Sequence, residues 1–115
     1  MSIVLYGIPN CDTIKKAKKF LQQNDIEYTF HDYRKDGLTA QMLDAFIEKL
    51  GWEAVLNKRG TTYRALSDEQ KQNLNETTAK QHMLDSPAMI KRPILDVDSN
   101  LHIGFKADQY QEIFK

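Results

Sequence analysis

Residues 3–20, IVLYGIPNCDTIKKAKKF, decide how this chain folds. The segment opens with a short apolar and β-branched run, Ile3–Tyr6, which is typical of a buried strand. The following residues Gly7–Pro9 indicate a turn. From position 10 or 11 onward, apolar residues recur at helical spacing and most of the lysines occupy the outer face. The stretch therefore predicts a strand, a turn and a helix.

The segments beyond the first helix extend this pattern. Residues 27–33 alternate aromatic with polar side chains, which predicts a second strand. A strand-helix-strand order of this length indicates a right-handed unit with two parallel strands. Near the end of the chain, residues 92–97 and 101–104 read as a hairpin, and residues 107–114 read as a closing helix. Together these elements predict the α/β order of the thioredoxin fold, β-α-β followed by β-β-α.

Residues 39–89 carry helical signals and no strand signal. Thr39 is a good N-cap for a helix that Gly51 ends. Ser67 with Gln70 has the spacing of a capping box. We therefore expect one thioredoxin-like domain over residues 1–115, with residues 39–89 as a helical insertion in its middle.

Composition excludes several classes of protein. Lys plus Arg total 16, and Asp plus Glu also total 16. The formal net charge is therefore zero, and this balance does not favour a nucleic-acid partner. No apolar run approaches the roughly 20 residues of a membrane span, and the first residues lack a signal-peptide pattern. The lone cysteine cannot form an internal disulfide, which argues against a secreted disulfide scaffold. The histidines show no metal-ligand spacing. We expect a cytoplasmic monomer without metal, nucleic acid or membrane.

Cys11 is the candidate nucleophile. At a helix N-terminus, free N–H groups and the positive end of the helix dipole stabilise a thiolate. Lys15 and Lys16 add to this effect, whereas Asp12 opposes it. The alternative is a small buried hydrophobe, which is how most isolated cysteines behave. The position of Cys11 at a strand-to-helix turn favours redox or nucleophilic chemistry.

A second thiol is missing from the position where redox enzymes often carry it. In a Cys-x-x-Cys motif the partner would stand at position 14, and this chain has Ile14 there. Oxidised Cys11 must therefore be resolved by another molecule, such as glutathione or a second protein thiol.

Arg92, with Pro93 after it, and Arg59 are further candidates. The peptide bond before Pro93 could be cis, which would fix a tight backbone reversal beside the site. Alternatively it is trans and Arg92 is merely solvated, and the sequence alone favours this second interpretation. Arg59 lies in a basic loop. Such loops are usually only solvated, but its guanidinium could offer a bidentate fork to a carboxylate or an oxyanion.

Four motifs give the chain a family resemblance. They are residues 6–17 (YGIPNCDTIKKA), 57–64 (NKRGTTYR), 90–94 (IKRPI) and 104–106 (GFK). With them the chain resembles the arsenate reductase (ArsC) family, within its branch of YffB-like thiol reductases and Spx-like regulators. The resemblance covers essentially the whole chain and implies a thioredoxin-like fold.

The resemblance also implies site residues. In arsenate reductases of this family, the active cysteine attacks arsenate within three arginines, and glutathione with glutaredoxin completes the reduction. By motif, Cys11 takes the place of the nucleophile, and Arg59 and Arg92 take the places of two arginines. The third arginine has no match, because Phe105 and Lys106 stand in that region. Asp-Thr-Ile also replaces the Gly-Thr-Ser that typically follows the cysteine. Both departures change oxyanion contacts and leave thiol chemistry intact.

We therefore expect a glutathione-dependent thiol-disulfide oxidoreductase with Cys11 as its catalytic residue and glutathione as thiol co-substrate. The expected partners are glutathione or glutaredoxin and a small oxidised thiol or an oxyanion. The residues expected to bind substrate or glutathione are Asn10, Thr13, Arg59, Arg92, Pro93 and Lys106. Two alternatives stay open: a glutathione- and glutaredoxin-dependent arsenate reductase, and an Spx-like regulator that binds RNA polymerase. Ile14 rules out the Cys-x-x-Cys switch of such regulators.

Overall fold

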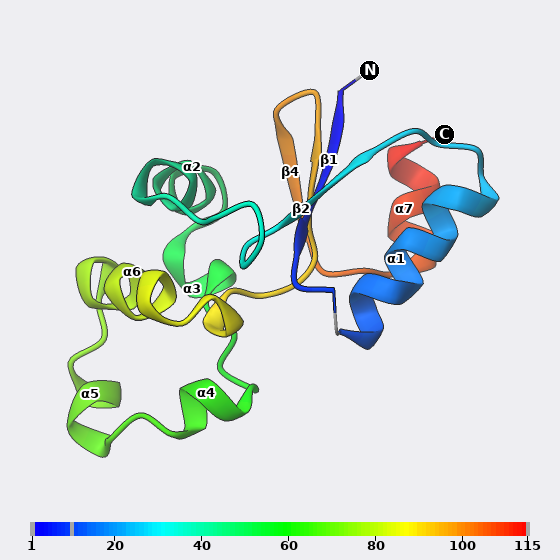
Figure 1. Cartoon of the computed structure of the whole chain (residues 1–115). Helices are drawn as coiled ribbons and strands as arrows, with labels where there is room; N and C mark the ends of the chain where they lie inside the picture. Colours follow the sequence, from blue (N-terminus) through cyan, green and yellow to red (C-terminus); the bar gives the residue numbers. More distant parts are fainter. Residues whose placement is uncertain (1, 10, 115) are drawn as a thin grey trace. The chain divides into compact units, whose positions relative to one another are not determined.

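The computed structural model describes residues 2–9 and 11–114, and they form two compact units (Figure 1). The sheet unit takes both ends of the chain, from the N-terminus to Asp36 and from Arg92 onward. The helical unit is Gly37–Lys91. The helical unit thus corresponds to the helical insertion predicted for residues 39–89.

The sheet unit holds four strands in the order β2-β1-β3-β4. They are β1 (Ile3–Gly7), β2 (Thr29–Asp32), β3 (Ile94–Val97) and β4 (Asn100–Ile103). β1 and β2 are parallel, while β3 pairs antiparallel with both β1 and β4. The predicted β-α-β unit and the predicted hairpin are confirmed. β2 is shorter than the expected strand over 27–33 because its pairing with β1 begins only at Thr29.

Two helices, α1 (Asp12–Gln23) and α7 (Ala107–Ile113), pack on one face of this sheet (Figure 1). The residues of β1 alternate between buried and half-buried, so every second side chain faces these helices. The resulting core contains Ile3, Leu5, Ala17, Leu21, Leu95, Val97 and Tyr110. The apolar residues that recur at helical spacing in α1 therefore form one face of the helix, and this face packs on β1.

The helical unit contains α2 (Ala40–Leu50), α3 (Trp52–Val55), α4 (Thr61–Arg64), α5 (Asp68–Gln72), α6 (Glu76–Asp85) and the 3₁₀ turn η1 (Pro87–Met89). The Thr39 hydroxyl accepts a hydrogen bond from the Met42 N–H at 3.1 Å, as expected of the N-cap of α2. The capping box at the start of α5 is present. Within 37–91 the only β pairing of the described residues is an isolated bridge between Leu56 and Ile90.

The peptide bond between Arg92 and Pro93 is cis, so the preference of the sequence for a trans bond is wrong. In an X-Pro bond the trans form is favoured by only about 0.5–1 kcal/mol, and tertiary packing can outweigh it. Pro93 is completely buried, and its carbonyl accepts a hydrogen bond from the Gly104 N–H at 2.9 Å. These contacts lie far apart in the sequence and could not be read from it.

Candidate functional site

Cys11 is the N-cap residue of α1, with extended backbone angles of φ −137° and ψ 127°. Its carbonyl accepts the first helical hydrogen bond, from the Lys15 N–H at 3.0 Å. Its side chain makes no capping hydrogen bond and is half-buried. The thiol therefore lies beside the free N–H groups of the first helical turn, which a thiolate or a bound anion can use.

The turn that leads to Cys11 is possible because Gly7 has no side chain. A methyl group at Gly7 would overlap the Cδ1 atom of Ile14, whose side chain is completely buried. The first turn of α1 thus packs directly on the end of β1. The residue that replaces the second thiol of a Cys-x-x-Cys motif is here a core side chain.

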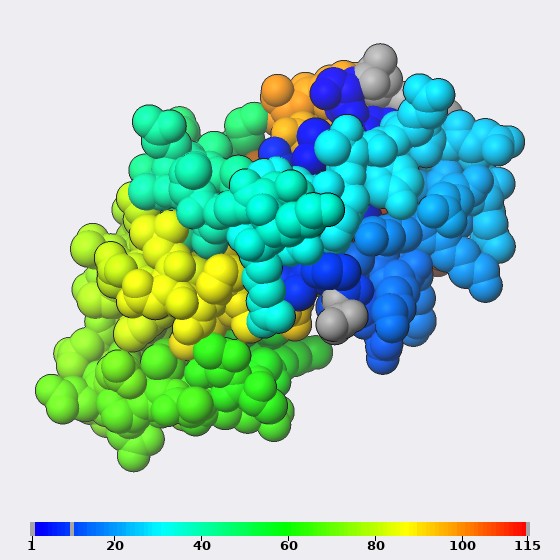
Figure 2. Space-filling view, in the orientation of Figure 1, coloured from blue at the N-terminus to red at the C-terminus, as the bar shows by residue number. Residues whose placement is uncertain are grey.

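The sheet brings several segments of the chain to the edge where Cys11 lies. β1 and β2 both end there, and the antiparallel β3 begins there. The Tyr33 N–H donates to the Gly7 carbonyl at 3.1 Å, directly after β2 ends. Arg92 and Pro93 immediately precede β3, and β4 ends at the same edge before Lys106, the N-cap of α7. Figure 2 shows that α1 and the chain after β2 both reach the surface.

A cluster of aromatic rings lies on the face of the sheet opposite α1 and α7. Tyr6 and Tyr33 are stacked with ring centroids 6.3 Å apart, and the His31 ring lies 5.1 Å from Tyr6 and 6.1 Å from Tyr33. Burial raises the pKa of Tyr33, the neighbouring Tyr6 raises it further, and the Arg92 guanidinium acts in the opposite direction. The positive charge of Arg92 therefore lies near the Tyr33 phenol, which remains protonated at neutral pH.

The predicted site residues in the sheet unit gather at this edge. Thr13 is half-buried in the first turn of α1, and Pro93 is buried. Arg92 is half-buried, and Lys106 is exposed. Asn10 lies outside the described residues.

Arg59 belongs to the helical unit, where it is exposed between α3 and α4. Its backbone N–H donates to the Asn57 side chain at 3.1 Å, which fixes the local turn.

Sequence reasoning missed Tyr33 as a member of the site. The sequence places it at the end of an alternating strand, where an aromatic residue is unremarkable. Its burial, at 3% exposure, and its proximity to Arg92 arise from partners elsewhere in the chain. The only usable signal was that an alternating strand places it on the same face as His31.

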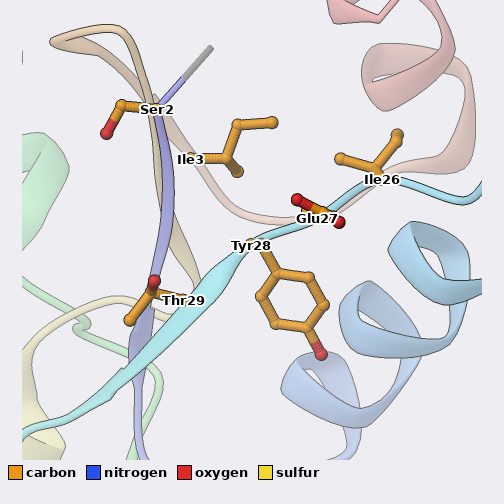
Figure 3. A pocket seen from close by; sticks show the side chains of 6 residues that line it. All are labelled: Ser2, Ile3, Ile26, Glu27, Tyr28 and Thr29. Atoms are coloured by element: carbon orange, nitrogen blue, oxygen red, sulfur yellow. The ribbon is translucent and has the colours of Figure 1, made fainter.

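A separate hollow lies at the opposite end of β1 and β2 (Figure 3). It opens where Ser2 and Ile3 diverge from the segment that leads into β2, and it is lined by Ile26, Tyr28 and Thr29 among others. Its lining includes no cysteine, and it lies at the end of β1 away from Cys11.

Among residues 2–9 and 11–114, no cluster of three or more His, Cys, Asp or Glu side chains could hold a metal ion. No helix in the described ranges is both long and apolar enough to cross a membrane.

Comparison with known proteins identifies the family. The profile of the ArsC family matches residues 6–113. The chain belongs to the ArsC family. This ArsC-family chain is 45% identical over 112 residues to an uncharacterised protein of Haemophilus influenzae, covering 97% of this chain and 98% of that one.

Two solved structures are also similar to this ArsC-family chain. A YffB protein shares 43% identity with a TM-score of 0.91, over 96% of this chain and 97% of its own. An ArsC-related protein from Brucella melitensis shares 48% identity with a TM-score of 0.83, over 100% of this chain and 96% of its own. The fold is thioredoxin-like, and a thioredoxin-like protein shares it at 17% identity with a TM-score of 0.50. The ArsC family, the YffB-like resemblance and the thioredoxin-like fold are thus confirmed.

Proposed function

We propose that this ArsC-family chain is a glutathione-dependent thiol-disulfide oxidoreductase that uses Cys11 as its single nucleophile. The observation that carries the proposal is the position of Cys11. It is half-exposed at the N-cap of α1, and its side chain caps nothing. A thiol in this position is accessible to a disulfide and lies beside the free N–H groups of the first helical turn.

The proposed reaction reduces a mixed disulfide between glutathione and a substrate thiol. The Cys11 thiolate attacks the glutathione sulfur, the substrate disulfide bond breaks, and the substrate leaves as a thiolate that takes up a proton. A glutathione thiolate then attacks the glutathione sulfur bound to Cys11. This step releases oxidised glutathione and restores the Cys11 thiolate. Because the chain has no second cysteine, this external thiol is required in every cycle.

Basic side chains support glutathione as the co-substrate. Glutathione carries two carboxylates, and Arg92 and Lys106 lie at the same sheet edge as Cys11. In our proposal these two side chains bind the carboxylates, Thr13 and Asn10 contact the bound sulfur, and Pro93 shapes the groove. Arg59 joins this set on the strength of its family motif. We further propose a monomer that acts in a cytoplasm supplied with glutathione and glutaredoxin.

Mass spectrometry tests the proposal. After incubation with oxidised glutathione, the protein should carry one glutathionyl group, located on Cys11. Cys11→Ser is the matched control, because serine is a good N-cap and keeps the helix start intact. The wild-type protein should also turn over a glutathione mixed disulfide in an assay coupled to NADPH through glutathione reductase, and C11S should not. Absence of a Cys11 adduct and of turnover would refute the proposal.

Arsenate reduction is a second candidate, favoured by Arg92. In the described part of the chain this guanidinium has no ion pair, and it lies at the same edge as Cys11. An oxyanion fits it as well as a carboxylate does. Reducing arsenate to arsenite takes two electrons, which Cys11 and one glutathione supply by forming a mixed disulfide while one arsenate oxygen leaves as water. Arsenate-dependent NADPH oxidation with glutathione, glutaredoxin and glutathione reductase tests this candidate. A rate that does not change on adding arsenate would exclude it.

A further inference from the structure

Tyr33 carries a hydroxyl group that the fold buries without a hydrogen-bond partner in the described residues. The side chain is only 3% exposed. Buried hydroxyl groups are nearly always hydrogen-bonded, because leaving one unpaired costs free energy. A buried hydroxyl without a partner therefore needs an explanation, and a ligand that accepts its hydrogen bond is one.

Arg92 is the second unpaired group in the same place. Among the described residues its guanidinium has no carboxylate within ion-pair distance. The register places Tyr33 and Arg92 on either side of β1, because Gly7 lies opposite Asp32 on one side and Tyr6 opposite Ile94 on the other. Two strands flanking a third are about 10 Å apart, which two long side chains can bridge from opposite sides.

The surroundings of the two side chains support a shared target. The Tyr33 ring stacks against the ring of Tyr6, which belongs to β1, the strand that lies between the segments of Tyr33 and Arg92. The Arg92 charge is close enough to act on the Tyr33 phenol. A phenolic O–H and a guanidinium are both donors, and together they match the oxygens of an anion.

We infer that the Tyr33 hydroxyl and the Arg92 guanidinium form an anion subsite that binds an anionic oxygen group of the ligand held at Cys11. The inference rests on the proposed function, and it adds Tyr33 as a binding residue. The shared chemistry is a carboxylate of glutathione or the oxygens of an oxyanion substrate. Arg92 is half-buried, so the ligand enters from its side and brings an acceptor to the covered hydroxyl.

The test measures equilibrium binding with probes that do not need a reactive thiol. S-methylglutathione and arsenate are titrated separately into isotope-labelled protein, and dissociation constants are taken from NMR shifts. Tyr33→Phe should weaken binding of the occupying probe by about tenfold or more, since a hydrogen bond to a charged group is lost. The probe whose affinity falls identifies the source of the anion.

Tyr110→Phe is the matched control. Tyr110 also carries a buried hydroxyl without a partner in the described residues, but it belongs to α7 and lies in the core on the opposite face of the sheet. Y110F makes the same chemical change away from the subsite and should leave both affinities within about twofold of wild type. Because each variant removes an unpaired hydroxyl, neither should lower the melting temperature of the ligand-free protein.

Arg92→Ala tests whether Tyr33 and Arg92 bind the same group. If Tyr33 and Arg92 hold one group, the losses in Y33F and R92A should be clearly non-additive in the double variant. The inference would be overturned if wild type and Y33F bound each probe with equal affinity. It would also be overturned if wild type bound neither probe. A marked drop in the melting temperature of Y33F would also overturn it, by showing a structural bond. If S-methylglutathione binds through Tyr33 but Cys11 forms no mixed disulfide, the subsite stands and the proposed function fails.

Discussion

Gly7→Ala is expected to damage the site through packing alone. The added methyl group would overlap Ile14 Cδ1 and lie 3.1 Å from Ile14 Cγ1. Ile14 is completely buried, so it has little room to move. Overpacking of this kind costs about 1–3 kcal/mol. Alanine also lowers the conformational entropy of the unfolded chain, which stabilises the folded state by about 0.4–1 kcal/mol. The net expectation is a loss of about 1–2 kcal/mol, or a melting temperature lower by roughly 4–8 °C.

A double-mutant cycle checks the cause. Ile14→Val removes the Cδ1 atom that the new methyl group meets, and by itself it should cost about 0.5–1.5 kcal/mol. In the combined variant Gly7→Ala should cost much less than it does alone, because the overlap has gone. Chemical denaturation gives the stabilities, and the rate at which a disulfide reagent modifies Cys11 shows whether the start of α1 has moved. Additive losses, or an unaltered stability in G7A, would refute the packing argument.

Three further predictions concern Cys11 chemistry, a helix cap and a surface ion pair. Ile14→Cys places a thiol three residues after Cys11, where Cα separations at a helix start suit a disulfide. After treatment with oxidised glutathione, mass spectrometry should find an internal disulfide in place of a lasting adduct, with a stability loss of roughly 1–3 kcal/mol from the core; a lasting adduct would contradict this. Thr39→Ala removes the cap of α2 and should lower unfolding stability by about 1 kcal/mol in denaturation experiments, with Cys11 reactivity unchanged. Lys80→Ala breaks the surface ion pair with Asp44, 2.6 Å long, and should change stability by about 1 kcal/mol or less; a larger loss would show a role beyond the pair.

Local patterns predicted most of the fold because the deciding signals are short-range. The apolar run at Ile3–Tyr6 gives β1, and the spacing after Cys11 gives α1. Ser67 and Gln70 form the capping box that their spacing indicates. Each of these signals acts within a few residues. The cis bond before Pro93 follows instead from packing between distant segments, and the sequence suggested the wrong isomer.

The position of the candidate site in the fold was predictable from local sequence patterns, and its surroundings were less so. Cys11 could be recognised because a strand-to-helix turn is a local feature. Arg92 was found through a family motif, and the sheet register now places it at the same edge as Cys11. Tyr33 could not be found, because its burial and its proximity to Arg92 depend on strands that pair across the whole chain. The substrate is a property of such long-range surroundings, so local patterns leave it open.

The sheet unit is built from the two ends of the chain, and this has a consequence for its synthesis. Between Asp36 and Arg92 the ribosome must make the entire helical unit before β3 and β4 exist. Until then β1 lacks its antiparallel neighbour β3, and the sheet edge where Cys11 lies lacks Arg92. Pairing such distant segments also carries the loop-closure cost that slows folding. The part of the candidate site that comprises Arg92, Pro93 and Lys106 is therefore added only when the last quarter of the protein has been made.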